Sequence, residues 1–254
     1  MNYKLEIATT DFAGTQAAVN GGADRIELCS GLSEGGLTPS FGLIKHCRQN
    51  FNLPIFPIIR PRSGDFLYND DEFGIIKNEI ALCKELGCDG IVVGLLKKDG
   101  RVDKKRLTTV VEKAYPMEVT FHRAFDRCIN PFEAMEEIIE AGCQRILTSG
   151  QQRTAMEGAE LIKKLIEIAN NRITIMPGSG VKKENIKSLA EITNAEEFHA
   201  SLRDTIKSKM DFLHASFSDA GNYEHPGILE DEVRAVKEEL KQLLKNNSFL
   251  REVK

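Results

Sequence analysis

The sequence predicts an α/β fold, a single (β/α)8 barrel of the TIM type in one domain that spans residues 1–254. Apolar strand segments alternate with amphipathic helix segments, and a glycine-terminated pattern recurs along the chain. Eight strand-plus-helix units also fit the 254 residues, at about 32 residues for each unit. A doubly wound open sheet is the alternative, and the first unit lacks the GxGxxG motif that would favour it.

The expected strands are short apolar runs. Gly22, Gly87 and Gly142 each end a stretch of helical period and stand just before such a run. Glycine ends helices in this way because it adopts the left-handed conformation without a steric cost. The eight expected strands cover residues 5–7, 25–29, 55–59, 90–93, 118–121, 145–148, 174–176 and 197–199.

The segments between the strands have helical periodicity, and some begin with a capping signal. Ser40 and Asn130 are N-cap candidates, and Pro131 suits the first helical position. Residues 201–227 are long and polar, so we expect a lid or a mobile loop before the last helix. Expected helices include residues 71–86, 131–141, 154–169 and 183–193.

Composition and charge indicate a soluble protein with a small-molecule partner. Hydrophobic residues make up 41% of the chain, charged residues make up 28%, and the net charge is −4. Domains that bind nucleic acid are usually clearly basic, so we expect no nucleic-acid partner. We expect no membrane partner either, because no apolar window of 18 residues exists. Six cysteines without disulfide spacing indicate a reducing, cytoplasmic location. The sequence leaves open whether the chain is a homo-oligomer.

Polar side chains gather where the expected strands end, which is the end of a barrel that carries its chemistry. Strand alternation directs Glu27 and Cys29 into the barrel and turns the apolar residues between them toward the helices. The same count places Thr120 and His122 inside. The other polar or small residues expected at this end are Glu6, Arg60, Arg62, Arg123, Thr148, Ser149, Gly150, Gly178, Ser179, Gly180 and His199.

Two interpretations of this polar cluster stay open. A carboxylate inside a barrel is costly unless it is paired. The first interpretation is therefore an internal salt-bridge network of Glu6, Glu27, Arg60 and Arg62. The second is a site for an anion or a carbonyl compound, in which Glu27 and a pair formed by His122 and Asp126 are catalytic candidates for proton transfer.

The loop after the seventh strand is a candidate anion site. Residues 178–180 lead toward an expected helix, so backbone N–H groups and the helix N-terminus can both face an anion. Residues 148–150 and the side chains of Arg60 and Arg62 are expected around the same pocket. The alternative is a tight turn whose glycines only permit the bend.

Six segments of the chain carry long and specific motifs: GADRIELCSGLSEGG (22–36), IRPRSGDF (59–66), VTFHRAFD (119–126), LTSG (147–150), MPG (176–178) and EFHAS (197–201). Together they resemble the CutC family of copper homeostasis proteins. The resemblance implies a TIM-like barrel, a cytoplasmic location and copper binding or homeostasis, without a firmly assigned enzymatic activity.

Within this resemblance, Cys29 is the candidate Cu(I) ligand, with neighbouring soft or imidazole groups. Cys83, Cys88 and Cys143 are expected at the opposite end of the barrel. The family often has a cysteine where this chain has Ala8, and its glycine loop is usually uninterrupted, whereas Ser179 interrupts it here.

Two functions follow from the sequence. The first is a copper homeostasis protein that binds Cu(I) through Cys29. The second is a barrel enzyme or binder that acts on a small phosphorylated or carboxylated metabolite by acid/base chemistry. Whether the protein is an enzyme stays open.

Overall fold

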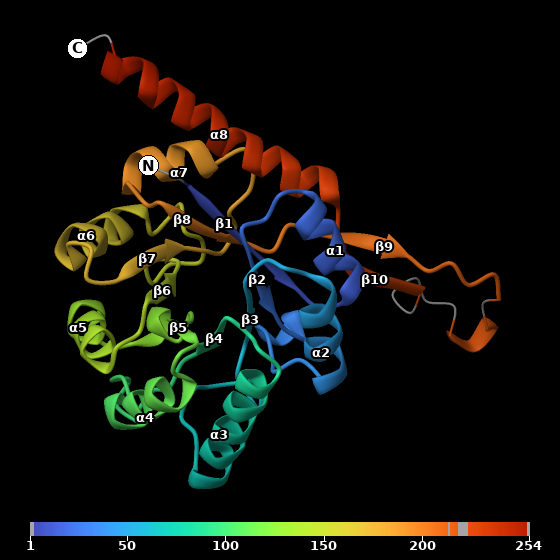
Figure 1. Ribbon diagram of the computed structural model, residues 1–254, viewed down its shortest axis with the longest axis horizontal. Coiled ribbons are helices and arrows are strands. Elements are labelled where there is room, and N and C mark those ends of the chain that lie inside the picture. Colours follow the sequence, from blue (N-terminus) through green and yellow to red (C-terminus); the bar gives the residue numbers. More distant parts are fainter. Residues whose placement is uncertain (1–2, 213, 218–222, 253–254) are drawn as a thin grey trace.

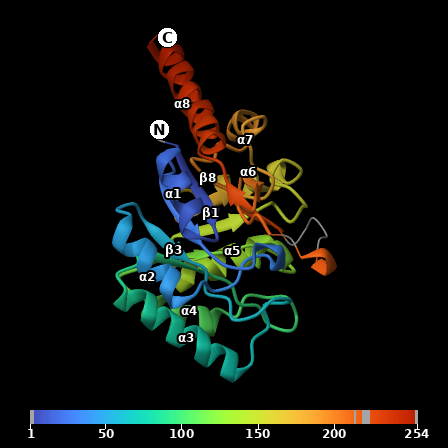
Figure 2. The same ribbon diagram turned by 90° about the vertical axis from the view of Figure 1, so that its right-hand side faces the viewer.

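The computed structural model describes residues 3–212, 214–217 and 223–252 and arranges them as a (β/α)8 barrel of the TIM type. Strands form the inner wall and helices surround it, as Figure 1 and Figure 2 show from two directions. The barrel strands are β1 (Lys4–Thr9), β2 (Arg25–Leu28), β3 (Ile55–Pro57), β4 (Gly90–Val93), β5 (Glu118–Phe121), β6 (Arg145–Thr148), β7 (Thr174–Pro177) and β8 (Glu197–Ala200). The helices are α1 (Phe12–Asn20), α2 (Phe41–Asn50), α3 (Asp70–Glu85), α4 (Lys104–Ala114), α5 (Pro131–Ala141), α6 (Ala159–Ala169), α7 (Ile186–Thr193) and α8 (Glu230–Glu252).

Hydrogen bonds join the strands into two parallel halves, in the orders β3-β2-β1-β8 and β4-β5-β6-β7. The halves meet where Ile58 bridges Val92 and the Ile59 N–H donates to the Val92 carbonyl at 2.7 Å. At the other junction β7 and β8 lie side by side. Since neighbouring strands are parallel, all their carboxyl ends lie at one end of the barrel.

The expected strands and glycine turns are confirmed. All eight strand segments are present, and Gly22, Gly87 and Gly142 have φ values of 91°, 74° and 92°. Ser40 caps α2, and Asn130 caps α5 with Pro131 in its first turn, as expected.

Two expected helices start later than their periodicity indicates. Residues 154–158 form a separate turn before α6, which Thr154 and Glu157 cap with reciprocal side-chain-to-backbone hydrogen bonds of 3.1 and 3.3 Å. Residues 183–185 form a loop before α7, in which the Asn185 amide donates to the Gly180 carbonyl at 2.8 Å. The Asn185 hydrogen bond competes with the first helical turn.

Strand alternation sorts the apolar side chains into two layers. The large layer, between the strands and the helices, includes Ile26 and Leu28. The small layer inside the barrel contains Cys29 beside Ala8 and Phe56. The expected facing of β2 is therefore confirmed.

The floor of the barrel, at the amino ends of the strands, is a network of buried ion pairs. Arg25 binds Glu6 and also Glu197, the latter at 2.7 Å, and Arg145 binds the same Glu197 oxygen at 2.9 Å. Both guanidinium groups lie over the ring of Phe56, at 5.2 and 5.4 Å from its centroid. The opposite charges offset part of the cost of burying these ions, and Arg145 also binds the half-exposed Glu118 at 2.6 Å.

The internal network expected from the sequence was therefore wrong in three of its four members. Only Glu6 belongs to the buried network, while Glu27, Arg60 and Arg62 bind elsewhere. Glu6 joins the network because it lies deep in the barrel, opposite Arg25 at the start of β2.

The expectation of a long loop over residues 201–227 is corrected. β9 (Arg203–Lys207) and β10 (Glu224–Ile228) form an antiparallel hairpin that projects from the barrel (Figure 1). Most of its residues are exposed and polar, so the segment lacks the apolar alternation by which a strand is recognised. Ile228 is buried, which anchors the hairpin just before α8.

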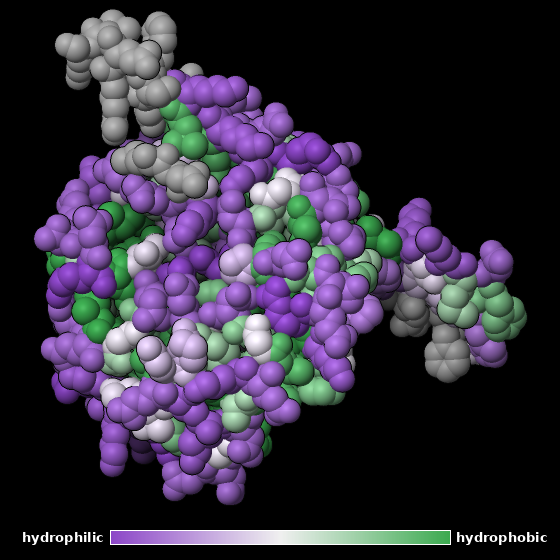
Figure 3. Space-filling model, in the orientation of Figure 1, coloured by the Kyte–Doolittle hydropathy of each residue, from purple (hydrophilic) through white to green (hydrophobic). Residues whose placement is uncertain are grey.

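The outer surface is mainly polar. The face in Figure 3 is mostly hydrophilic, with apolar side chains showing in separate areas. Among the described residues, no helix has the length and apolar character needed to cross a membrane.

Candidate functional site

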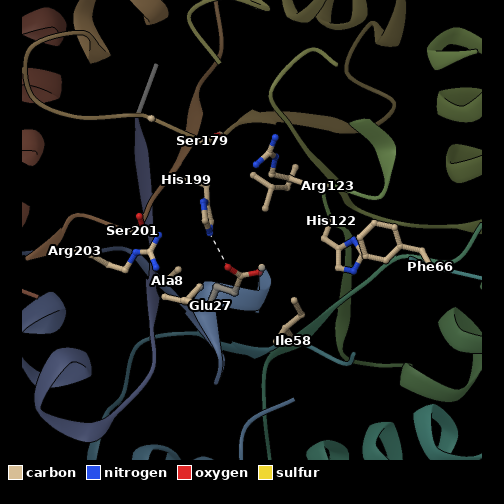
Figure 4. Close-up of a pocket in the computed structure, with 14 residues that line it drawn as sticks. Ala8, Glu27, Ile58, Phe66, His122, Arg123, Ser179, His199, Ser201 and Arg203 are labelled. Atoms are coloured by element: carbon tan, nitrogen blue, oxygen red, sulfur yellow. Dashed lines mark hydrogen bonds and ion pairs between the residues drawn. The ribbon is translucent and has the colours of Figure 1, made fainter. Parts of the chain in front are cut away.

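A cavity of about 260 Å³ opens at the carboxyl ends of the barrel strands (Figure 4). Its base includes the apolar side chains of Ala8, Ile58 and Leu147. Its polar lining comes from different elements that the fold brings together, namely Glu27, His122, Arg123, Ser179, His199 and Arg203.

Glu27 and His199 form a buried acid–base pair across the β2 and β8 ends. The His199 Nε2 lies 2.7 Å from Glu27 Oε2 and 3.9 Å from Glu6 Oε1. Burial alone would lower the pKa of His199, but the charges of Glu27 and Glu6 and the hydrogen bond to Glu27 outweigh it and raise this pKa. Glu27 Oε1 makes no hydrogen bond to a described residue, so it is open to a ligand in the cavity.

His122, at the end of β5, is a neutral imidazole. Its Nδ1 accepts the backbone N–H of Ala124 at 3.1 Å, so the ring proton is on Nε2. Burial, with Arg60 and Arg123 adding to it, lowers the pKa of His122 to about 3. His122 therefore lines the cavity as an uncharged imidazole at physiological pH, with its Nε2–H buried.

The expected pairing of His122 with Asp126 is wrong. The Asp126 carboxylate instead accepts the Ser149 N–H at 3.0 Å, the Ser149 hydroxyl at 2.9 Å and the Thr148 hydroxyl. The short helix Phe125–Arg127 turns Asp126 toward β6, away from the imidazole. Asp126 thus fixes the loop after β6, including Gly150, and none of these residues lines the cavity.

The two arginines expected to bind an anion are engaged elsewhere. Arg60 is buried and donates to the backbone carbonyls of Glu34, Gly36 and Gly64 at 2.7, 2.9 and 3.0 Å. Arg62 forms ion pairs with Glu72 and Asp65 outside the cavity, at 2.5 and 2.9 Å. Neither guanidinium lines the cavity, so the expectation for Arg60 and Arg62 is corrected.

Two other arginines line the cavity in their place. Arg123 is held by Asp126 at 2.7 Å and by the Ser149 hydroxyl at 2.8 Å. Arg203 extends from β9, and its guanidinium makes no hydrogen bond or ion pair with any residue that the structure describes. Arg203 was missed because it lies in the segment expected to be a loop. Its position three residues after β8 was the available signal.

The glycine loop after β7 reaches the cavity, but its expected link to a helix is absent. Ser179 and Gly180 line the cavity with left-handed φ values of 81° and 72°. Helix α7 begins only at Ile186, so its N-terminus does not follow the loop directly. A serine in the left-handed region is strained, whereas glycine adopts this conformation without a steric cost.

The donors at this end do not fit a copper centre. Cu(I) prefers thiolate and thioether ligands. The thiol of Cys29 donates to the Thr9 carbonyl at 3.3 Å, and burial together with the charge of Glu27 raises its pKa well above the ordinary value. Within the described part of the chain, no three His, Cys, Asp or Glu residues are grouped as metal ligands would be.

Sequence comparison finds close relatives. The profile of the CutC family matches residues 3–204, which include all eight barrel strands. A CutC family protein of Chromobacterium violaceum is 44% identical over 244 residues, which are 94% of this chain and 99% of the relative. The human copper homeostasis protein cutC homolog is 45% identical over 214 residues, which are 84% of this chain and 78% of that protein.

Solved structures agree with this relationship. The crystal structure of CutC from Streptococcus agalactiae is 30% identical and superposes with a TM-score of 0.75, covering 78% of this chain and 98% of that chain. Phosphoribosyl anthranilate isomerase from Thermotoga maritima, at 12% identity and a TM-score of 0.56 over 94% of this chain and 99% of its own, shares the barrel fold alone. The resemblance seen in the sequence motifs is confirmed, and the chain belongs to the CutC family.

Proposed function

We propose that the cavity binds a small phosphorylated or carboxylated metabolite and carries out acid/base chemistry on it. The observation that carries this proposal is the guanidinium of Arg203, which has no hydrogen bond or ion pair with a described residue and lies beside the buried pair of Glu27 and His199. A cation without a partner at the mouth of a cavity favours an anionic ligand. A carboxylate and an imidazole below it are groups that transfer protons in enzymes.

The cavity supplies enough binding energy for such a ligand. A charge-assisted hydrogen bond is worth about 1.5–3 kcal/mol, and Arg203 and Arg123 both line the cavity. Millimolar affinity needs about 4 kcal/mol. Two such hydrogen bonds give about 3–6 kcal/mol, a range that includes this requirement, and Arg203 gives the larger share because Asp126 already binds Arg123.

The test is the thermal stability of the protein with phosphate or citrate. An anion at ten times its dissociation constant should raise the melting temperature by about 3–6 °C. Arg203→Ala should lose most of this gain, while Lys207→Ala, on the same exposed strand but outside the cavity, should keep it. If chloride at matched ionic strength stabilises the wild type as much, the cavity is not an anion site.

Cu(I) binding is the second candidate, because the human and mouse relatives are named copper homeostasis proteins. In this function Cys29 would be the thiolate ligand, after loss of its proton. Cys29→Ser should then abolish Cu(I) retention under reducing conditions, whereas Cys83→Ser should retain it. Equal retention by the wild type and Cys29→Ser would exclude Cys29 as the copper ligand.

The proposed location is the cytoplasm. All six cysteines are buried free thiols, which is typical of proteins in a reducing compartment. Fractionation of the host cells with an antibody against the chain tests this location.

A further inference from the structure

His122 has a hydrogen-bond donor that the fold leaves without a partner. Its Nε2 carries the ring proton and finds no acceptor among the described residues, although the side chain is buried. The ring is held by Phe66, with centroids 4.9 Å apart, and by the backbone of Gly94. Leaving a buried N–H without an acceptor is unfavourable. A fixed, unpaired donor in the wall of a cavity therefore indicates a ligand oxygen at this point.

Glu27 presents a free carboxylate oxygen to the same cavity. Its Oε2 is fixed by His199 at 2.7 Å, while its Oε1 has no partner among the described residues. Figure 4 shows Glu27 and His122 on facing sides of the cavity. A ligand between them meets the carboxylate on one side and the imidazole on the other.

Apolar side chains lie beside both groups. Ala8, Ile58 and Phe66 line this part of the cavity, and a neutral imidazole does not place a second charge opposite Glu27. Hydrogen bonds and charges act more strongly in such an environment than in water. A fixed donor and a fixed base beside apolar side chains are suited to a reaction in which negative charge develops on a carbonyl oxygen.

We infer that the substrate carries a carbonyl group next to a C–H bond, and that Glu27 removes this proton while His122 Nε2–H binds the carbonyl oxygen. This inference rests on the proposed function and names its substrate class and reaction. Arg203 and Arg123 at the mouth of the cavity bind the phosphate or carboxylate of the same molecule.

The reaction balances without an oxidant or another reactant. The C–H bond breaks and its proton forms an O–H bond on Glu27 Oε1. The electron pair of that bond forms a C=C bond, and the carbonyl π pair moves to the oxygen, giving an enolate hydrogen-bonded to His122. Return of a proton from Glu27 to carbon restores the carbonyl compound. Even when no new product forms, the C–H proton therefore exchanges with solvent.

The experiment follows this exchange by proton NMR in D2O, with dihydroxyacetone phosphate, pyruvate and 2-oxoglutarate as probes. The wild type should accelerate loss of the C–H signal of at least one probe. Glu27→Gln, purified in parallel, should show only the background of contaminating enzymes. His122→Phe should lower the rate by about 10²–10³, the usual effect of losing one oxyanion donor. Lys207→Ala should match the wild type.

A second measurement applies even where His122→Phe does not fold. Nitrogen-15 NMR of the wild type should show His122 as the neutral Nε2–H tautomer from pH 5 to 8, and its Nε2 signal should shift when oxalate, a planar enolate mimic, is added. A charged His122, or one that carries its proton on Nδ1, overturns the inference.

Absence of exchange above the Glu27→Gln background with all three probes also overturns it. If anions still stabilise the wild type through Arg203 in that case, the proposed function stands and only the carbonyl chemistry fails. If no anion stabilises the protein, both fail.

Discussion

Glu197 is the acceptor that holds together the buried floor of the barrel. One of its carboxylate oxygens binds Arg25 at 2.7 Å and Arg145 at 2.9 Å. Glu197→Gln keeps the size of the side chain but removes its charge, and the two guanidinium groups above Phe56 then lose their shared counter-ion. Breaking a buried ion pair by removing one partner costs about 3–5 kcal/mol. Arg25 keeps Glu6 and Arg145 keeps Glu118 as partners, so we expect a loss of about 3 kcal/mol in the free energy of unfolding, the lower end of this range.

Urea denaturation measures this loss. The melting temperature should fall by roughly 6–12 °C, at about 2–4 °C for each kcal/mol. Glu136→Gln is the matched control, because Glu136 binds Arg172 at the same 2.7 Å but on the surface. Exposed pairs contribute little, so this variant should keep nearly the wild-type stability. Equal losses from Glu197→Gln and Glu136→Gln would refute the argument that burial gives the floor network its importance.

The pH dependence gives the same experiment a second readout. Burial alone would raise the pKa of Glu197, but Arg25 and Arg145 outweigh it, so this pKa is lowered in the folded protein. A carboxyl group whose pKa is lower in the folded state stabilises it above the unfolded pKa, and this contribution is lost as pH falls through the folded value. The stability difference between wild type and Glu197→Gln should therefore be constant near neutrality and shrink in acid.

Two further predictions concern the cavity. In Gly94→Ala the new Cβ would lie 2.4 Å from the His122 ring, so the variant should lose about 1–3 kcal/mol in urea denaturation. The control Gly74→Ala, in the open helical position of α3, should gain about 0.5–1 kcal/mol; a stable Gly94→Ala would contradict the packing argument. The pKa of His199 is raised in the folded state, so its contribution to stability is fully present below about pH 6.5 and is lost as pH rises through the folded value. The stability gap between wild type and His199→Gln should accordingly narrow from pH 6 to pH 9, and a widening gap would show that Glu27 does not hold the imidazolium.

The sequence alone determined the barrel and the facing of its strands. These features depend on local chemistry: the alternation of Ile26, Glu27, Leu28 and Cys29 assigns the two faces of β2. A glycine such as Gly142 marks the end of a helix because it adopts the left-handed conformation there. Each of these signals lies within a few neighbouring residues, so it can be recognised before the fold is known.

Only the tertiary structure decided which polar groups meet. Arg25 and Glu197 are 172 residues apart in the chain and form one ion pair, and Glu27 and His199 are likewise 172 residues apart. A pattern of residue types does not encode such distances. Asp126 therefore binds the loop after β6 rather than His122, and Arg203 enters the cavity from a hairpin that has no apolar alternation. Which groups become partners depends on how deep each side chain lies in the barrel and on where it points. Both are defined only once all eight strands are assembled.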